Sequence, residues 1–201
     1  MKQLLIIFTI FMGLLWGGTN TKKHIDGVKG FKFLTPNTVI VGDIKSSGLE
    51  YTRADASTRY VLTVSDFSYL GQKREIQLNF IKNKGIGGAP SLKPYFNKDV
   101  LYMVEVTLDN YKTLEQVVKL SENIQKTTDL TFVKRKDERA AELSQTLTHC
   151  LQNEDVVMEL SFVRVNVGYW IEKGHIKMFS RRVYEDIYGL LDDKKDAVND
   201  M

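Results

Sequence analysis

Alternating apolar and polar residues predict that the first half of the chain is mainly β-structure. Between residues 74 and 82, Ile76, Leu78 and Phe80 fall on one face and polar residues on the other. This period of two is typical of a strand with one face in the core. By the same criterion, strengthened by β-branched residues and flanking turn signals, we predict strands over residues 31–34, 38–44, 59–67, 74–82 and 100–108.

The spacing of apolar residues becomes helical after residue 108. Residues 109–126 carry an apolar stripe, and Asp109 or Asn110 is a suitable N-cap because its side-chain oxygen can accept from a free amide of the first turn. Residues 136–152 also place apolar residues on one helical face. We therefore predict helices over both segments, with a short strand over 130–135 between them.

The C-terminal third is predicted to form a long strand, a hairpin and a final helix. Along residues 156–170 the apolar alternation changes phase, so either a β-bulge lies near Phe162 or different stretches bury different faces. Gly174 is the expected turn residue of the hairpin, because a short turn favours positive φ. The last helix is expected to run from Ser180 as N-cap to about Leu191.

Together these elements predict an α+β fold. We expect a mainly antiparallel sheet of about six to eight strands, with two or three helices packed on one face. Its 201 residues, 43% of them hydrophobic, are typical of a globular protein. We assign residues 22–192 to a single domain and residues 193–201 to a flexible tail.

The first twenty-one residues have the order of a signal peptide. Lys2 forms a short basic region, residues 4–16 are almost wholly apolar, and Gly17 and Thr19 are small residues where cleavage would occur. The apolar run is short for a membrane span, which needs about 20 residues. We favour a cleaved signal peptide over residues 1–21, with an uncleaved anchor and a buried core helix as the alternatives.

The net charge and the cysteine content of the chain argue against two classes of protein, those that bind nucleic acid and those held together by disulfides. The formal net charge of +3 is too small to favour nucleic-acid binding. Cys150 is the single cysteine, so no disulfide within the chain can form. We expect its thiol to be buried and unreactive, because it falls on the apolar stripe of the predicted helix.

Motifs for catalysis or cofactor binding are weak. The glycines of residues 85–88 are followed by prolines rather than by a helix, so they do not form a phosphate-binding fingerprint. The three histidines lack metal-ligand spacing, and we predict neither a metal nor another cofactor. Glu105 and Glu159 could converge as a catalytic pair, but both fall on the polar side of a predicted strand, where solvated side chains are expected.

The long connection over residues 83–96 is the one candidate binding segment. Loops of this length in compact domains are often functional, and this one combines lysines with aromatic residues suited to contact with a partner. The candidate binding residues are Lys84, Lys93, Tyr95 and Phe96.

These observations predict an exported binding or interaction protein, periplasmic or secreted. Its expected partner is another protein or a component of the cell envelope, with membrane contact only if the N-terminal segment is retained. Two alternatives remain open: a small hydrolase that acts on envelope material through carboxylates, and an accessory domain anchored by the uncleaved N-terminal segment.

Overall fold

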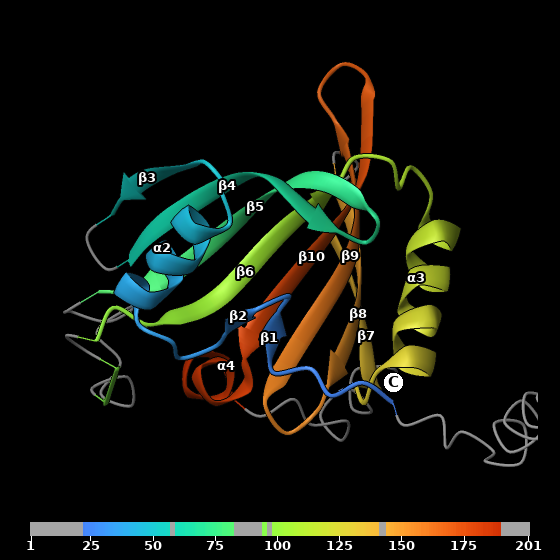
Figure 1. Cartoon of the computed structure of the whole chain (residues 1–201). Helices are drawn as coiled ribbons and strands as arrows, with labels where there is room; N and C mark the ends of the chain where they lie inside the picture. The colour runs from blue at the N-terminus through green and yellow to red at the C-terminus, as the bar shows by residue number, and fades with distance from the viewer. Residues whose placement is uncertain (1–21, 57–58, 83–93, 96–97, 141–143, 190–201) are drawn as a thin grey trace, which may run out of the picture.

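A large, twisted antiparallel sheet dominates the structure. The computed structural model describes residues 22–56, 59–82, 94–95, 98–140 and 144–189, which form an eight-stranded sheet, a separate two-stranded sheet and three helices (Figure 1). This confirms the predicted α+β fold. The elements in chain order are β1 (Gly27–Val28), β2 (Phe31–Lys32), α2 (Asn37–Ser46), β3 (Tyr51–Asp55), β4 (Arg59–Tyr69), β5 (Gln72–Ile81), β6 (Leu101–Leu108), α3 (Leu114–Thr127), β7 (Thr131–Ala140), β8 (Ser144–Gln152), β9 (Val156–Asn166), β10 (Trp170–Ser180) and α4 (Arg181–Tyr188).

The large sheet consists of two meanders joined by one crossover. Its strand order is β3-β4-β5-β6-β10-β9-β8-β7, so the first four strands follow the chain and the last four run back from the far edge. Helix α3 makes the crossover from β6 to β7 and packs over β8 and β9. The last strand, β10, then pairs with β6 and closes the sheet.

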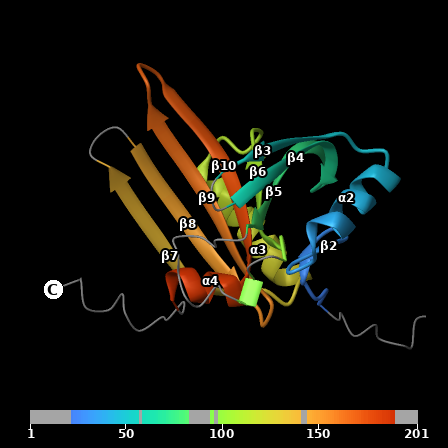
Figure 2. The same ribbon diagram turned by 90° about the vertical axis from the view of Figure 1, so that its left-hand side faces the viewer.

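Two helices cover one face of the sheet, which we call the core face. Ile40 and Ile44 of α2 and Val117 and Ile124 of α3 are buried in the main hydrophobic cluster with side chains from the strands. Helix α4 packs instead on the opposite face, where Val183 joins a smaller cluster. Figures 1 and 2 show α2 and α3 on one side of the sheet and α4 near one end of β10.

Helix α3 begins later than the sequence predicted. Its N-cap is Thr113 rather than Asp109 or Asn110, and the Thr113 hydroxyl accepts from the amide of Gln116. The Gln116 side chain in turn accepts from the Thr113 amide and completes a capping box. These two hydrogen bonds satisfy the backbone amides of Thr113 and Gln116, which explains why the helix begins here and not at Asp109 or Asn110.

Residues 38–44 are helical, so the predicted strand there is wrong. Pro36 precedes α2, and Ile40 and Ile44 are its buried residues. Positions four apart share a face in a strand as well as in a helix. The β-branched residues of this segment are therefore compatible with a strand as well as a helix. Packing of the segment against the sheet favours the helix.

The described residues of 136–152 belong to the paired antiparallel strands β7 and β8, so the helix predicted there is also wrong. Leu147 and Leu151 lie on the core face, and their spacing of four is common to both structures. Cys150 is fully buried as expected, but it points to the opposite face of β8 rather than along a helical stripe. Strand β8 pairs with β7 on one side and β9 on the other, and these long-range hydrogen bonds replace the helical ones.

The β9–β10 hairpin is regular and longer than predicted. No register shift interrupts its pairing, so no β-bulge lies near Phe162, and from Ser161 to Asn166 both faces of β9 are only partly buried. Gly174 is not the turn residue, because it lies within β10 opposite Leu108, and Gly168 with φ +92° lies in the turn. A Cβ at Gly174 would lie 3.0 Å from Cβ of Tyr111, so close packing explains this glycine.

The last helix is as expected at its start. Ser180 occupies the N-cap position of α4, although its side chain makes no capping hydrogen bond. Residues 190–191 of the predicted helix, the tail over 193–201 and the signal segment over 1–21 lie outside the described residues. Within the part of the chain that is described, no helix has both the length and the apolar character needed to cross a membrane.

Candidate functional site

The face of the sheet opposite the core face carries a row of charged residues. Lys177 of β10 pairs in register with Glu105 of β6 on one side and with Glu159 of β9 on the other. Neighbouring strands lie about 4.8 Å apart, so the Cα atoms of the two glutamates are about 10 Å apart with the lysine between them. The structure thus brings together two carboxylates that the sequence could only place on separate polar faces.

These residues line a groove of about 820 Å³ between the sheet and helix α4. Its wall combines charged side chains with aromatic ones. The lining residues are Arg59, Tyr102, Met103, Glu105, Lys134, Lys136, Glu138, Glu159, Lys177, Phe179, Tyr184, Tyr188 and Gly189. An adjoining hollow of about 640 Å³ shares Glu105 and includes His175 and Asn110.

A triangle of hydrogen bonds lies at the centre of the groove. Lys136 Nζ is 3.0 Å from Glu159 Oε1, and the Tyr184 hydroxyl donates to the same oxygen over 3.1 Å. Lys136 also donates to the Tyr184 hydroxyl over 3.3 Å. The triangle therefore joins strand β7, strand β9 and helix α4.

The electrostatics of the triangle keep it charged at neutral pH. Burial lowers the pKa of Lys136, but the hydrogen bond and charge of Glu159 act against it, and the net shift is upward. Burial, with the charge of Glu159, raises the pKa of Tyr184 to about 12. The lysine thus remains a cation and the tyrosine remains a hydrogen-bond donor.

Aromatic side chains form the wall beside the triangle. The rings of Phe179 and Tyr184 lie 5.1 Å apart, and those of Tyr184 and Tyr188 lie 4.9 Å apart. Tyr188 is largely exposed. Its ring offers an apolar surface beside the charged row, which suits a ligand with both charged and apolar parts.

The predicted binding segment is described only in part. Tyr95 is 5% exposed and belongs to the smaller hydrophobic cluster, with the Arg182 guanidinium 5.6 Å from its ring centre. The sequence composition had favoured partner contact over core for this residue, and burial corrects that interpretation. Lys84, Lys93 and Phe96 lie outside the described residues, so a binding role for the segment stays a prediction.

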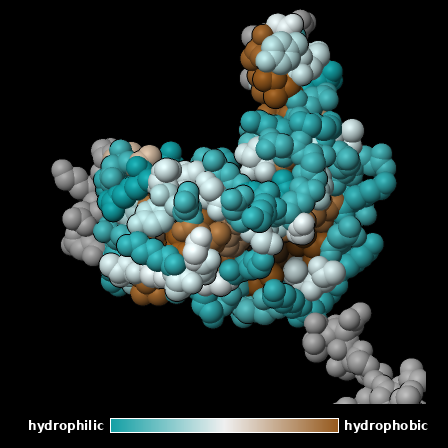
Figure 3. Space-filling view, turned by 45° about the horizontal axis from the view of Figure 1, so that its top comes forward, coloured by the Kyte–Doolittle hydropathy of each residue, from teal (hydrophilic) through white to brown (hydrophobic). Residues whose placement is uncertain are grey.

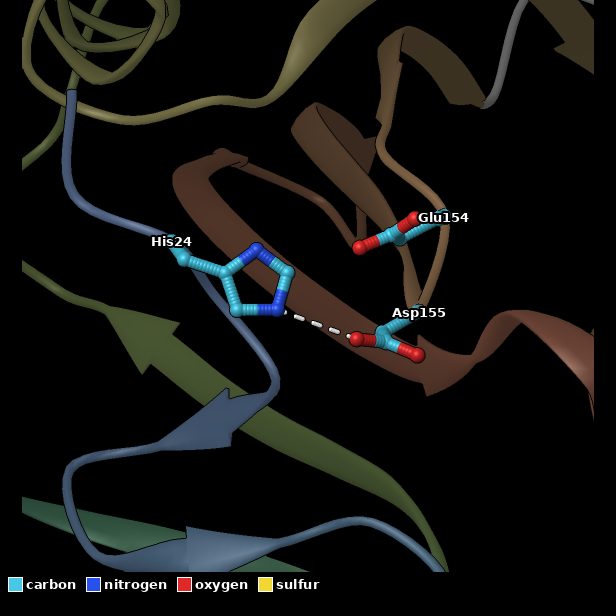
Figure 4. Close-up of side chains that lie close together, drawn as sticks. All are labelled: His24, Glu154 and Asp155. Carbon is cyan, nitrogen blue, oxygen red and sulfur yellow. Dashed lines mark hydrogen bonds and ion pairs between the residues drawn. The ribbon is translucent and has the colours of Figure 1, made fainter.

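A second cluster of polar groups lies where the described chain begins. His24, Glu154 and Asp155 each place a potential metal-ligand atom within 4.8 Å of the others, and all three are exposed (Figure 4). His24 Nε2 lies 3.0 Å from Asp155 Oδ2, and Nδ1 bonds to Asp129. Hydrogen bonds to Asp129 and then to Asp155 raise the pKa of His24.

The contacts of His24 make this cluster a hydrogen-bonded clasp. Both ring nitrogens of His24 face carboxylates, those of Asp129 and Asp155. The clasp holds the N-terminal segment against the end of α3 and the β8–β9 turn. The sequence did not predict this clasp, because the two partners of His24 lie more than 100 residues away along the chain.

The chain gives no significant match to protein-family models, to curated proteins or to solved structures. The fold and the groove therefore define the protein only as an α+β protein with a charged groove on one face of a large antiparallel sheet.

Proposed function

We propose that this chain is an exported binding protein of the cell envelope or exterior that takes a polar ligand in the groove. The observation that carries the proposal is the triangle of Lys136, Glu159 and Tyr184 beside the exposed ring of Tyr188. Rigid charged groups next to an aromatic surface are what a binding site requires to orient a ligand.

The chemistry of the carboxylates favours binding over hydrolysis. A glycosidase-type hydrolase needs one carboxyl group that is protonated to act as a general acid. Glu159 instead accepts from Lys136 and Tyr184, and Glu105 Oε2 lies 3.8 Å from Lys177 Nζ. Each carboxylate is therefore engaged by a neighbouring cation of the sheet.

The charge of the groove favours a ligand with an anionic group. Among the described lining residues, four are cations and three are carboxylates, which leaves an excess of one positive charge. Lys136 is already paired with Glu159. Lys177 lines the same groove as Tyr188, is more exposed than Lys136, and lies farther from its own carboxylate, 3.8 Å from Glu105. It is the cation we expect to contact the ligand, while the tyrosine contacts its apolar part or sugar ring.

Binding is tested with two chemically defined probe sets, acidic oligosaccharides and acidic peptides, by isothermal titration calorimetry. The double variant Lys177→Met, Tyr188→Ala should weaken binding at least about tenfold, since it removes a charge-assisted hydrogen bond and an aromatic contact. Lys119→Met is the matched control, because this lysine lies on α3 over the opposite face and is exposed. Absence of binding by both sets, or equal binding by the double variant, would overturn the proposal.

Export is tested separately by intact-mass analysis of the protein from the producing cell. We expect a chain that begins near residues 20–22 and is found outside the cytoplasm. A cytoplasmic species that retains Met1 would contradict export. A full-length species in the membrane fraction would support the anchored alternative instead.

A further inference from the structure

The β9–β10 hairpin projects beyond the rest of the molecule and ends in exposed apolar side chains. Figure 1 shows it extending past the neighbouring strands, and Figure 3 shows a hydrophobic cluster at its end. The exposed fractions are 55% for Val167, 69% for Tyr169, 45% for Trp170 and 37% for Ile171. We call residues 165–171 the hairpin tip. Exposed apolar side chains gathered in this way mark an interaction site.

The apolar side chains of the tip point in several directions. Trp170 and Ile171 are consecutive in β10, so they lie on opposite faces of the hairpin, and Val165 lies opposite Ile171. Tyr169 and Val167 occupy the turn between the strands. A flat protein surface would cover only one of these faces, whereas an apolar medium surrounds them all.

Charged side chains follow immediately behind the apolar tip. Arg164 lies three residues before Val167, a distance of about 10 Å along the strand. Its guanidinium stacks 4.1 Å from the Trp170 ring centre, and its Nε lies 3.1 Å from Glu172 Oε1. Lys173 follows and leaves one excess positive charge at this level. The tip thus has an apolar end, then aromatic rings and then charged groups. This is the order of the layers in a membrane interface, where apolar groups enter the headgroup and acyl boundary by about 5–10 Å.

Two backbone amides of the turn are hydrogen-bonded within the turn. The Val167 amide donates to the Tyr169 carbonyl over 3.0 Å, and the Gly168 amide donates to Asn166 Oδ1 over 3.0 Å. Pairing of the strands continues to Asn166 and Trp170. Since an unpaired amide is costly in an apolar medium, these bonds lower the cost of placing the turn among lipid chains.

We propose that the hairpin tip inserts into the interfacial layer of a lipid bilayer. Val167 and Tyr169, in the turn, enter deepest and reach the acyl boundary. Trp170 and Ile171 lie behind them at the headgroup level, and Arg164 and Lys173 stay with the phosphates. This inference is independent of the groove and of its ligand. The tip also lies at the opposite end of the molecule from the blue start of the described chain (Figures 1 and 2).

Trp170 makes the inference directly measurable. The chain has two tryptophans, Trp16 and Trp170. In the full chain carrying Trp16→Phe, fluorescence therefore reports on the tip alone. With vesicles of phosphatidylcholine, alone or mixed with phosphatidylglycerol, we expect a blue shift and quenching by lipids brominated near the headgroup end of the acyl chain. This reporter remains decisive even if the N-terminal segment itself binds the vesicles.

Two further variants in the same background separate insertion from adsorption. Tyr169→Ser with Ile171→Thr should reduce quenching of Trp170 at least about fivefold, because apolar area leaves the insertion surface. Val39→Ser, at an exposed valine of α2, should leave quenching unchanged. Unshifted and unquenched Trp170 in both vesicle types would overturn insertion, as would equal losses in the two variants. Binding only to the anionic vesicles with Trp170 still in water would also overturn it, because it would show electrostatic adsorption alone.

Discussion

The ammonium group of Lys136 and the carboxylate of Glu159 lie 3.0 Å apart on the groove face, spanning β8, the strand between them in the sheet. The pair is partly buried, with 17% of the Glu159 side chain exposed. It ties the edge strand β7 to β9, and through Tyr184 it also ties both to α4. The same contact that shapes the groove therefore stabilises this end of the sheet.

We predict that Glu159→Gln lowers the free energy of unfolding by about 1–3 kcal/mol, since it leaves Lys136 partly buried without its counter-charge. Urea denaturation at neutral pH measures the change. Glu115→Gln is the control, because its ion pair with Lys119 is exposed and should contribute little to stability. Equal effects of the two substitutions would show that the groove pair has no special role in stability.

The His24 clasp should make stability depend on pH. Because Asp129 and Asp155 raise the pKa of His24 above 6.5, its contribution is fully present below that value and is lost as the pH rises through the raised pKa. His24→Gln should therefore destabilise the protein more at about pH 5.5 than at about pH 8.5. Thermal unfolding of both proteins at both pH values gives the difference.

Asp155→Asn provides the control for this pH effect. Removing one carboxylate should reduce the extra stability on the acid side while leaving the histidine in place. Asp129 also has a lowered pKa, but its own loss occurs only as the pH falls through the acid range below 3.8. A His24→Gln effect that is the same at both pH values would contradict the charged clasp.

Two glycines should respond in opposite ways to alanine. Gly174→Ala would place a Cβ 3.0 Å from Tyr111 and 3.2 Å from Leu108, so we expect a loss of about 1–3 kcal/mol from overpacking. Gly42, within helix α2, has no atom within 4 Å of the added Cβ. Gly42→Ala should therefore stabilise by about 0.5–1 kcal/mol. Denaturant midpoints compare the two, and a neutral Gly174→Ala would refute the close-packing explanation of this glycine.

The Cys150 thiol should react slowly in the native protein. It is fully buried and lies on the same face of the sheet as Glu159, its partner in β9. Ellman's reagent should label it at a rate limited by local opening, and much faster after addition of denaturant. Rapid labelling without denaturant would show that the groove face opens readily, which would also weaken the case for a rigid binding site.

The sequence was sufficient for strands whose pattern has only one interpretation. In β5, Ile76, Leu78 and Phe80 alternate strictly with polar residues, and the strand lies where this pattern predicted it. The same holds for β4 and β6 and for the start of α4 at Ser180. In these segments the local order of side chains already fixes which face is apolar, because successive residues of a strand point to opposite faces.

Only tertiary structure decided the ambiguous segments. Ile40 and Ile44, like Leu147 and Leu151, are four residues apart and share a face in both a helix and a strand. The first pair became helical against the core face, and the second became part of β8 because strands formed on both sides of it. Gly174 was likewise predicted to lie in a turn, whereas in the structure it allows close packing of Tyr111.

The sequence determined that apolar and charged residues would separate onto two faces, because that separation depends on neighbours along the chain. It did not determine that Glu105, Lys177 and Glu159 form one row, or that Lys136 reaches Glu159. Glu105 and Lys177 are 72 positions apart, on strands that become neighbours only through the crossover of α3. Lys136 reaches Glu159 across the intervening strand β8. The groove therefore depends on sheet order and register, which follow from the packing of the whole chain and not from any one segment.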